Sequence, residues 1–240
     1  MNNWQLGFNE EVSPIGAGII DLHNMVMYYI IIILSIVIYH VVIKVFTIEQ
    51  SVNWLRTRNH STIIELIWTL TPGIILVIIA IPSLKLLYSL DEIIKPNVTL
   101  KATGYQWYWS YEINDIEGLE INLDSYTLSD EEVADGQLRL LDVDQRVYLP
   151  ILTPIRLLVT GQDVIHSFFV PSFGIKIDAI PGRINHASIY ILRPGTYYGQ
   201  CTELCGAGHH KMSIVIEGVK TPDYLDWLAS FSSPLGEGNH

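Results

Sequence analysis

Two long apolar runs dominate the first half of the pattern along this chain. Met25–Phe46 reads "MVMYYIIIILSIVIYHVVIKVF", 22 residues that contain a single charged side chain. As a helix this run would measure about 33 Å, which matches the hydrocarbon core of a bilayer. Ile63–Leu90 is also strongly apolar, with Pro72 and Pro82 inside it, so we expect a second span that is kinked. The pattern predicts a two-helix transmembrane hairpin.

The charges that flank the two runs indicate their orientation. The connection between them carries Arg56 and Arg58, whereas the 24 residues before the first run hold no Lys or Arg. The positive-inside rule therefore places the connection on the side of synthesis and both termini on the far side. The residues before the first run are acidic, unlike those of a cleaved signal, so we expect the hairpin to stay in the mature protein. We expect a tail outside the membrane over residues 1–21, the hairpin over 22–95 and a water-facing domain over 96–240.

From Asn97 onward the apolar pattern changes from helical to short β-rich runs. Turn residues separate them at short intervals, which predicts a β-sandwich or small barrel of antiparallel strands. An acidic surface loop is expected over Ser125–Gly136 and a last helix over Pro222–Phe231. The fold class is therefore a membrane-anchored all-β protein. The expected strands are "VTLKATGYQWYWSYEI", "QLRLLDV", "RVYLPI", "IRLLVTG", "HASIYIL" and "MSIVIEG".

Charge is concentrated in the predicted β domain. The chain has a formal net charge of −11, and from Pro96 to His240 there are 18 Asp or Glu against 9 Lys or Arg. Such an acidic surface attracts basic partners and repels the phosphate backbone of nucleic acid. We therefore expect a basic protein partner and no nucleic-acid binding.

The only two cysteines, Cys201 and Cys205, lie in the string "GQCTELCGAGHHKM". Three interpretations compete for them. A disulfide is compatible with an oxidising compartment beyond the membrane. A zinc site usually needs four Cys or His ligands at close spacings, and here a second pair is missing. Copper is the third interpretation, because thiolate, thioether and imidazole ligands select it and the string adds His209 and Met212, with His166 upstream.

Two thiolates suit two copper ions better than one. A single blue-copper ion uses one thiolate, whereas two bridging sulfurs serve both metals and let one electron be shared between them. Sharing spreads the geometric change on oxidation and reduction over two centres and lowers the cost of reorganisation. The ligand set therefore favours a dinuclear electron-transfer site.

Three strings closely resemble subunit II of the haem-copper cytochrome c oxidases, and the resemblance extends from the first helix to about Leu228. They are "YYGQCTELCGAGHHKM", "VIHSFFVPSFGIKIDAIPGRINH" and "KATGYQWYWSYEI". The resemblance implies a cupredoxin-like β-barrel that holds the dinuclear copper centre CuA. It also implies that Cys201 and Cys205 bridge the coppers, with His166 and Met212 on one ion, and His209 with the Glu203 carbonyl on the other.

Glu203 has a second implied role. In the family, the matching side chain points to a magnesium ion shared with subunit I, so one residue contacts both kinds of metal. His186 and His210 match no ligand role in the family. We therefore expect Mg²⁺ as a second cofactor, held through Glu203.

The aromatic string "YQWYWSYE" is the second unusual feature. Alternation along one strand would put Tyr105, Trp107, Trp109 and Tyr111 on one face, which is too many rings for the core of a small barrel. The resemblance implies that Trp107 lies at the surface above the copper centre, where electrons arrive from cytochrome c. Many family members have histidine where this chain has Tyr105, and a period of two does not explain why Trp107 rather than Trp109 should be exposed.

Cytochrome c is basic, and carboxylates near the arrival point would steer it at a rate that falls with salt. The resemblance implies four docking carboxylates. They are Glu112, Asp115, Asp144 and Asp163.

Glu65 is an ionisable group inside the second apolar run. Such groups are costly in a membrane and are functional candidates, although Glu65 is close enough to the end of the run to reach the interface. The resemblance implies a position at the mouth of a proton-uptake path into subunit I. The positive-inside orientation puts Glu65 on the uptake side as well.

These features together predict the electron-accepting subunit of a respiratory terminal oxidase. Electrons would pass from cytochrome c to CuA and then to haem a of subunit I, where oxygen is reduced at haem a3–CuB and protons are pumped. A quinol-oxidase subunit would lack the copper ligands, a copper carrier would hold them on an exposed flexible motif, and a nitrous oxide reductase would add a large catalytic domain. We expect a mitochondrial inner membrane with the acidic domain in the intermembrane space, or alternatively a bacterial plasma membrane, with lipid and other oxidase subunits as neighbours.

Overall fold

The computed structural model describes residues 7–47, 60–92, 95–116 and 119–232. Contacts divide the chain into two compact units. One unit spans Gly18–Tyr88, and the other joins the described residues up to Ala17 with the chain from Ser89 onward. Arg56 and Arg58 lie outside the described residues, so the membrane orientation drawn from them stays a prediction.

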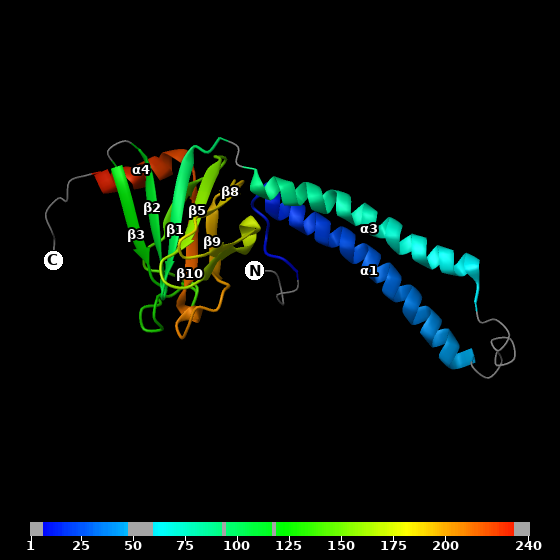
Figure 1. Ribbon diagram of the computed structural model, residues 1–240. Coiled ribbons are helices and arrows are strands. Elements are labelled where there is room, and N and C mark those ends of the chain that lie inside the picture. Colours follow the sequence, from blue (N-terminus) through cyan, green and yellow to red (C-terminus); the bar gives the residue numbers. More distant parts are fainter. Residues whose placement is uncertain (1–6, 48–59, 93–94, 117–118, 233–240) are drawn as a thin grey trace. The chain divides into compact units, whose positions relative to one another are not determined.

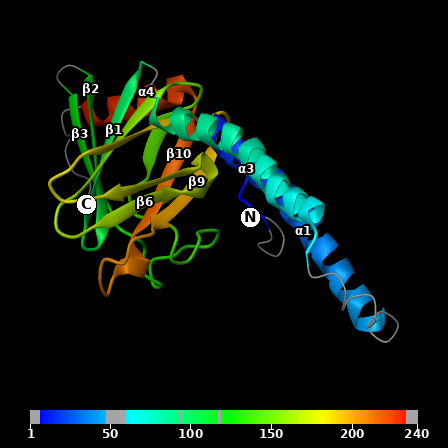
Figure 2. The ribbon, with the colours of Figure 1, turned by 45° about the vertical axis from the view of Figure 1, so that its right-hand side comes forward.

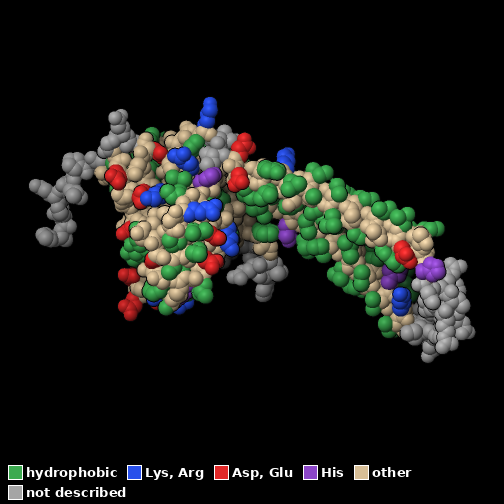
Figure 3. All heavy atoms as spheres, viewed as in Figure 1, with side chains coloured by type: hydrophobic (Ala, Val, Ile, Leu, Met, Phe, Trp, Pro, Cys, Tyr) green, Lys and Arg blue, Asp and Glu red, His purple; other side chains and the backbone are tan. Residues whose placement is uncertain are grey.

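Two long helices form the first unit, α1 (Pro14–Thr47) and α3 (Thr62–Asp91). They lie side by side in both views (Figure 1, Figure 2), and a Cβ added to Gly18 would come 2.8 Å from Leu86 Cδ1. Both helices are long and apolar enough to cross a membrane, and the most apolar 18-residue stretch of each has no buried residues. Figure 3 shows hydrophobic side chains covering much of their visible surface. Both predicted spans are therefore confirmed as helices.

Helix α1 begins at Pro14, well before the apolar run that predicted it. The Ser13 hydroxyl accepts the Gly16 N–H at 2.9 Å, and proline follows at the first helical position, where its missing N–H costs nothing. Ser13 also donates to the main-chain oxygen of Phe173 at 2.7 Å, while Val12 is buried in the core of the water-facing domain. The hydrogen bond between Ser13 and Phe173, two residues far apart in sequence, therefore helps to fix where α1 begins.

Ten strands form two five-stranded sheets in the second unit (Figure 1). The first sheet has the order β3-β2-β1-β5-β8, with bounds Leu119–Ser125, Tyr108–Ile116, Val98–Tyr105, Ile155–Gly161 and Asn185–Ile189. The second has the order β4-β10-β9-β6-β7, with bounds Val147–Pro150, Ser213–Val219, Gly195–Cys201, His166–Val170 and Ile175–Ala179. The prediction of a β-sandwich is confirmed.

Alternating side chains fill the core between the sheets. The strand β5 alternates buried and half-buried residues along its length, as a strand with one face on a core should. The largest buried rings are Trp109, Tyr111 and Phe168, and the rings of Trp109 and Phe168 meet edge to face with centroids 5.2 Å apart. The predicted last helix is confirmed as α4 (Thr221–Ser232), whose Trp227 ring lies 5.3 Å from that of Tyr148 on β4.

The sheets are not purely antiparallel, which corrects one prediction. Strand β1 pairs in parallel with β5, and β10 pairs in parallel with β4. Each pair joins strands that are distant in sequence, so alternation within a single strand carries no information about their relative direction.

The string "VTLKATGYQWYWSYEI" forms two strands, where a single strand was predicted. The chain turns at Gln106 and Trp107, and Tyr105 pairs with Tyr108 across the hairpin. A single strand of this length would extend about 53 Å, well beyond the usual strand length in globular domains. Folding back lets both halves bury one face in the same core.

The string "QLRLLDV" forms turns, so the predicted strand there is wrong. The Asp142 N–H bonds back to the Leu138 carbonyl at 2.9 Å, and Leu140 has a φ of 61°. The buried Asp142 carboxylate accepts two hydrogen bonds from Arg146 at 2.7 and 2.9 Å. This ion pair between buried Asp142 and half-buried Arg146, together with the local turn bonds, outweighs the strand propensity of the leucines. The neighbouring acidic segment from Ser125 is mostly exposed loop, as predicted.

Candidate metal centre

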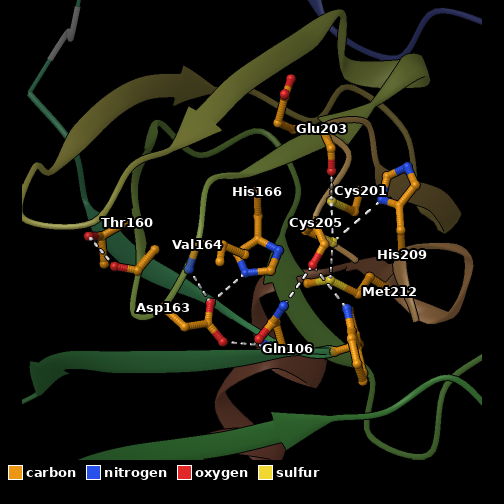
Figure 4. A network of polar contacts seen from close by, with 12 residues as sticks. Gln106, Thr160, Asp163, Val164, His166, Cys201, Glu203, Cys205, His209 and Met212 are labelled. Carbon is orange, nitrogen blue, oxygen red and sulfur yellow. Dashed lines mark hydrogen bonds and ion pairs between the residues drawn. The ribbon is translucent and has the colours of Figure 1, made fainter. Parts of the chain in front are cut away.

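Five predicted ligand residues converge at one end of the second sheet (Figure 4). His166 is the first residue of β6 and Cys201 is the last residue of β9, and these strands pair with Phe168 opposite Cys201. The chain then loops through Cys205 and a short 3₁₀ turn, His209–Lys211, to Met212, which directly precedes β10. Strand pairing therefore brings His166 to a loop that lies far from it in sequence.

The distances within this group are short. The sulfurs of Cys201 and Cys205 lie 4.0 Å apart, and the ligand atoms of His166 and both cysteines all lie within 4.8 Å of one another. Cys205 Sγ lies 3.5 Å from His209 Nδ1 and 3.5 Å from Met212 Sδ. The main-chain oxygen of Glu203 lies 3.3 Å from Cys201 Sγ. All six predicted ligand groups are thus gathered around the two sulfurs.

The sulfur geometry fits a metal and excludes a disulfide in this structure. An S–S bond measures about 2.05 Å, and both cysteines are free. A thiolate–metal bond measures about 2.3 Å, so one ion can contact two sulfurs that lie 4.0 Å apart. Burial of both sulfurs and of the Met212 thioether leaves soft donors without water, which suits a soft metal such as copper.

His166 is held with one ring nitrogen free to bind. Its Nε2 lies 2.8 Å from Asp163 Oδ1, while its Nδ1 is buried with no hydrogen-bond partner and faces the cysteines in Figure 4. Gly104 gives the ring its space, because a Cβ there would lie 2.8 Å from the ring. A buried nitrogen without a partner is costly unless a ligand satisfies it.

The two thiols differ in how readily they ionise. Burial opposes ionisation of Cys201, but the neighbouring His166 side chain, the backbone of Ser167 and Glu203, and the His209 side chain favour its thiolate and lower its pKa to about 7. Burial, together with the negative charge on Cys201, raises the pKa of Cys205. Ionisation of one thiol therefore opposes ionisation of the other, and a bound cation would favour both thiolates.

The tip of the β1–β2 hairpin packs on the cysteine loop. The Gln106 side-chain amide and the Trp107 indole both donate to the Cys205 carbonyl, at 2.8 and 3.2 Å. A Cβ on Gly208 would lie 2.4 Å from the Trp107 ring, and Gly206 has a φ of +122°. Glycine at these two positions lets the loop pass beneath the indole.

Trp107 is 36% exposed, whereas Trp109 and Tyr111 are buried. The hairpin turn separates Trp107 from the strand that carries the other two, which resolves the question left by simple alternation. Tyr105 stacks on Tyr108 with ring centroids 4.9 Å apart, and Tyr108 stacks on Tyr126 at 4.5 Å. The tip therefore places Trp107 on the cysteine loop, next to a stack of tyrosine rings.

The four predicted docking carboxylates do not form one cluster. Asp163 bonds the Gln106 N–H at the tip, and Asp144 bonds the Tyr126 N–H, each at 2.7 Å. Glu112 forms a salt bridge with Lys101 at 2.8 Å. Asp115 lies eight residues beyond Trp107, roughly 26 Å along an extended strand, and bonds the Thr99 N–H. Asp144 and Asp163 are therefore the two at the aromatic tip.

The main chain and the side chain of Glu203 face different ways. Its main-chain oxygen faces Cys201, while its exposed side chain points away in Figure 4. That side chain lines a polar cleft of about 720 Å³ whose charged residues include Asp91, Lys176, Asp178, Arg183 and His186. His210 is exposed and His186 lies in the cleft, so neither joins the sulfur-lined group.

Glu65 lies in the first turn of α3, and its side chain is exposed. Its carboxylate accepts a long hydrogen bond from the Ser61 N–H at 3.4 Å. Glu65 thus lies at the N-terminal end of α3, where its negative charge is compatible with the positive end of the helix dipole.

Two supporting residues escaped the sequence-based prediction. Gln106 was not among the predicted site residues, although it lies next to Trp107, which was. Thr127 accepts the Ser213 N–H and donates to the Lys211 carbonyl, each at 2.9 Å, and so brackets Met212 from both sides. No local signal could reveal this contact, because the partners are 84 residues apart.

The fold and the site together define a class: a membrane-anchored β-sandwich with a buried sulfur- and imidazole-lined group suited to a metal. The chain belongs to the cytochrome c oxidase subunit II family. Residues 98–219 match the family described as "Cytochrome C oxidase subunit II, periplasmic domain", and residues 1–86 match its "transmembrane domain". The resemblance inferred from the sequence is confirmed, and the chain is a membrane-anchored subunit of an oxidoreductase complex.

Relatives match over nearly the whole chain. Cytochrome c oxidase subunit 2 of Pneumocystis carinii is 48% identical over 228 residues, covering 94% of each chain. The Chondrus crispus protein is 48% identical over 232 residues, covering 95% of this chain and 91% of its own.

The water-facing domain also resembles solved structures. The periplasmic domain of subunit II of cytochrome oxidase from Bradyrhizobium japonicum is 42% identical, covers 59% of this chain and 97% of its own, and superposes with a TM-score of 0.54. A second structure is the mixed disulfide intermediate between a thioredoxin-like protein and a cytochrome c oxidase subunit II, 40% identical with a TM-score of 0.50, covering 58% of this chain and 94% of its own. The predicted cupredoxin-like class is confirmed by this likeness.

Proposed function

We propose that this chain is the electron-accepting subunit of its oxidase and that its sulfur-lined site holds the dinuclear copper centre CuA. When bound, the two coppers supply a one-electron store that accepts from cytochrome c and donates to haem a of subunit I. The observation that carries the proposal is the ligand set: two free thiols 4.0 Å apart, with two imidazoles, a thioether and a carbonyl around them. Cys201 and Cys205 would bridge, with His166 and Met212 on one ion, and His209 and the Glu203 carbonyl on the other.

The alternatives fit these residues less well. A quinol-oxidase subunit dispenses with copper, yet this chain retains every proposed ligand. A copper carrier needs exposed ligands that exchange, whereas His166, Cys201, Cys205 and Met212 are all buried. Burial of the donors favours a permanent site, which suits electron transfer.

Trp107 is our candidate for the place where electrons arrive. Its indole is exposed on one side and bonded to the Cys205 carbonyl on the other, which supports a short route from the surface to a ligand residue. Asp144 and Asp163 lie beside the same tip, so they are the stronger candidates for steering basic cytochrome c, with Glu112 and Asp115 contributing from further along β2.

Two further roles follow from the family. The Glu203 side chain would bind Mg²⁺ together with subunit I, and its position in a polar cleft outside the sulfur-lined group supports a separate ion. Glu65 would lie at the mouth of a proton-uptake path coupled to proton pumping, and its exposure at a helix end is compatible with that role. We place the complex in the mitochondrial inner membrane, with the copper domain in the intermembrane space.

Copper loading would require both thiols to be reduced. The cysteines are free and close together, and a related subunit II was captured in a mixed disulfide with a thioredoxin-like protein. We infer that a thiol reductant acts on this pair before metal is bound.

Electron paramagnetic resonance of the purified, oxidised complex tests the main proposal. We expect hyperfine structure from two equivalent coppers that share one unpaired electron. A single-copper pattern, or no copper signal with both thiols blocked in a disulfide, would reject it.

A further inference from the structure

Asp163 makes more contacts at the candidate centre than a docking carboxylate needs. Its Oδ1 lies 2.8 Å from His166 Nε2 and accepts the Val164 N–H at 2.6 Å, while its Oδ2 accepts the Gln106 N–H at 2.7 Å. Figure 4 shows the carboxylate between the His166 ring and the hairpin tip.

A carboxylate on Nε2 decides how the His166 ring can act. Nε2 must carry the proton to donate to Asp163, and this leaves the lone pair on Nδ1, the buried nitrogen without a partner. The backbone of Gly104 also lies close to the ring, because a Cβ there would come 2.8 Å from it. The tautomer and the direction of the ring are both set before any metal arrives.

The second oxygen extends the same contact to the cysteine loop. Asp163 holds Gln106 through its backbone N–H, and Gln106 in turn donates its side-chain amide to the Cys205 carbonyl at 2.8 Å. One carboxylate thus links the segment that carries His166 to the cysteine loop through the hairpin tip. This segment and the cysteine loop, from Cys201 to Met212, carry all the proposed copper ligands.

We propose that Asp163 is a positioning residue of the metal centre, which orients His166 and ties the hairpin tip to the cysteine loop, in addition to any part in docking. The inference rests on the proposed copper function. Removal of the carboxylate would free the ring and weaken the link to Cys205. Replacing a residue that orients a metal-bound histidine typically lowers metal affinity about ten- to a hundredfold.

The test compares Asp163→Asn with Asp144→Asn in the intact oxidase. Asp144 is a matched control because it lies at the same tip and accepts backbone N–H groups from Tyr126 and Gln145, with no hydrogen bond to a ligand side chain. Both variants remove one negative charge. Haem spectra of the purified complex verify assembly, and Asp163→Glu, which restores the charge with a longer arm, serves as a second variant if the asparagine complex fails to assemble.

Two readouts need no cytochrome c. We expect Asp163→Asn to lose copper to a chelator about ten- to a hundredfold more readily than the unaltered complex, with a changed histidine-nitrogen coupling in the paramagnetic resonance spectrum. Asp144→Asn should keep the unaltered values of both, and any rise in its KM for cytochrome c should disappear at high salt.

The outcomes separate the two levels of inference. If Asp163→Asn retains copper and the unaltered spectrum, and only its KM changes, Asp163 is a docking residue alone and the proposal is overturned. If the unaltered complex itself shows no copper signal, the proposed function fails and this inference fails with it. With the unaltered copper signal present, a failure concerns Asp163 only.

Discussion

The indole N–H of Trp107 donates to the main-chain oxygen of Cys205 over 3.2 Å. An exposed aromatic ring is therefore hydrogen-bonded to a residue whose sulfur lies in the candidate metal centre. The ring is also fixed from below, because Gly208 leaves no room for a side chain between the loop and the indole. This contact joins the surface to the centre through a single residue.

Trp107→Phe keeps an aromatic side chain but replaces the indole by a phenyl ring and removes the N–H. Loss of one hydrogen bond costs on the order of 1 kcal/mol, so we expect the domain to fold and retain copper. Electron transfer from reduced cytochrome c should slow, measured by stopped-flow reduction of copper at saturating cytochrome c. Trp227→Phe in α4 is the control and should leave the rate unchanged. Equal rates in all three proteins would remove Trp107 from the route.

Gly208→Ala tests the fit between loop and indole. The new methyl group would lie 2.4 Å from the Trp107 ring, and such overpacking typically costs about 1–3 kcal/mol. We expect a lower midpoint in urea unfolding of the water-facing domain. Trp107→Leu in the same chain should recover part of the loss, because it removes the clashing atoms. An alanine variant as stable as the unaltered domain would show that the loop adapts freely.

Asp144→Asn should raise the KM for cytochrome c at low ionic strength more than Glu112→Gln does. Asp144 lies at the aromatic tip, whereas the charge of Glu112 is offset by Lys101 at 2.8 Å. Steady-state assays over a salt series measure the difference, which should vanish as screening increases. An equal effect of the two substitutions would mean that docking senses only the net charge of the domain.

Glu65→Gln removes the charge and keeps an oxygen able to accept the Ser61 N–H, so the start of α3 should persist. Turnover should slow while copper is still reduced at the unaltered rate, because proton uptake and electron arrival occur at different places. Rapid-mixing reduction and steady-state oxygen consumption in one preparation provide the two measurements. Slower copper reduction would contradict the proton-path role.

Oxidation of the cysteine pair should abolish copper binding. A disulfide would draw the sulfurs from 4.0 Å to about 2.05 Å and remove both thiolates. We expect two coppers for each reduced domain, and copper binding only after a thiol reductant restores the oxidised form. Thiol titration and metal analysis follow both states. Copper bound at full stoichiometry by the disulfide form would refute the bridging role.

Local patterns were enough to predict the helices and the kinds of ligand. Apolar runs long enough to cross a bilayer favour helices, which satisfy their own backbone hydrogen bonds, and both runs are helices. Two Cys, a His and a Met within one short string are so close in the chain that any compact fold keeps them near one another. These inferences depend on contacts between residues that are near in sequence.

Prediction failed where distant contacts decide the structure. "QLRLLDV" has the apolar content of a strand, but it forms turns, and its Leu140 carbonyl accepts a hydrogen bond from the Ser213 hydroxyl, 73 residues away. Propensity also could not locate the turn at Gln106–Trp107, which reverses the chain inside an otherwise regular β pattern. The start of α1 at Pro14 likewise depends on Ser13 bonding to Phe173, a partner 160 residues away.

The sequence by itself determined the membrane hairpin, the β-rich acidic domain and the inventory of soft ligands, because these follow from hydrophobic runs and from spacing within short segments. Only the tertiary structure decided that Trp107 is exposed while Trp109 is buried, and that Asp163 bonds His166 while Gln106 reaches Cys205. These contacts join the β1–β2 hairpin tip, the segment from Asp163 to His166 and the cysteine loop, which are held by different strands. Their geometry arises from the pairing of the strands, which the local pattern of polar and apolar residues does not encode.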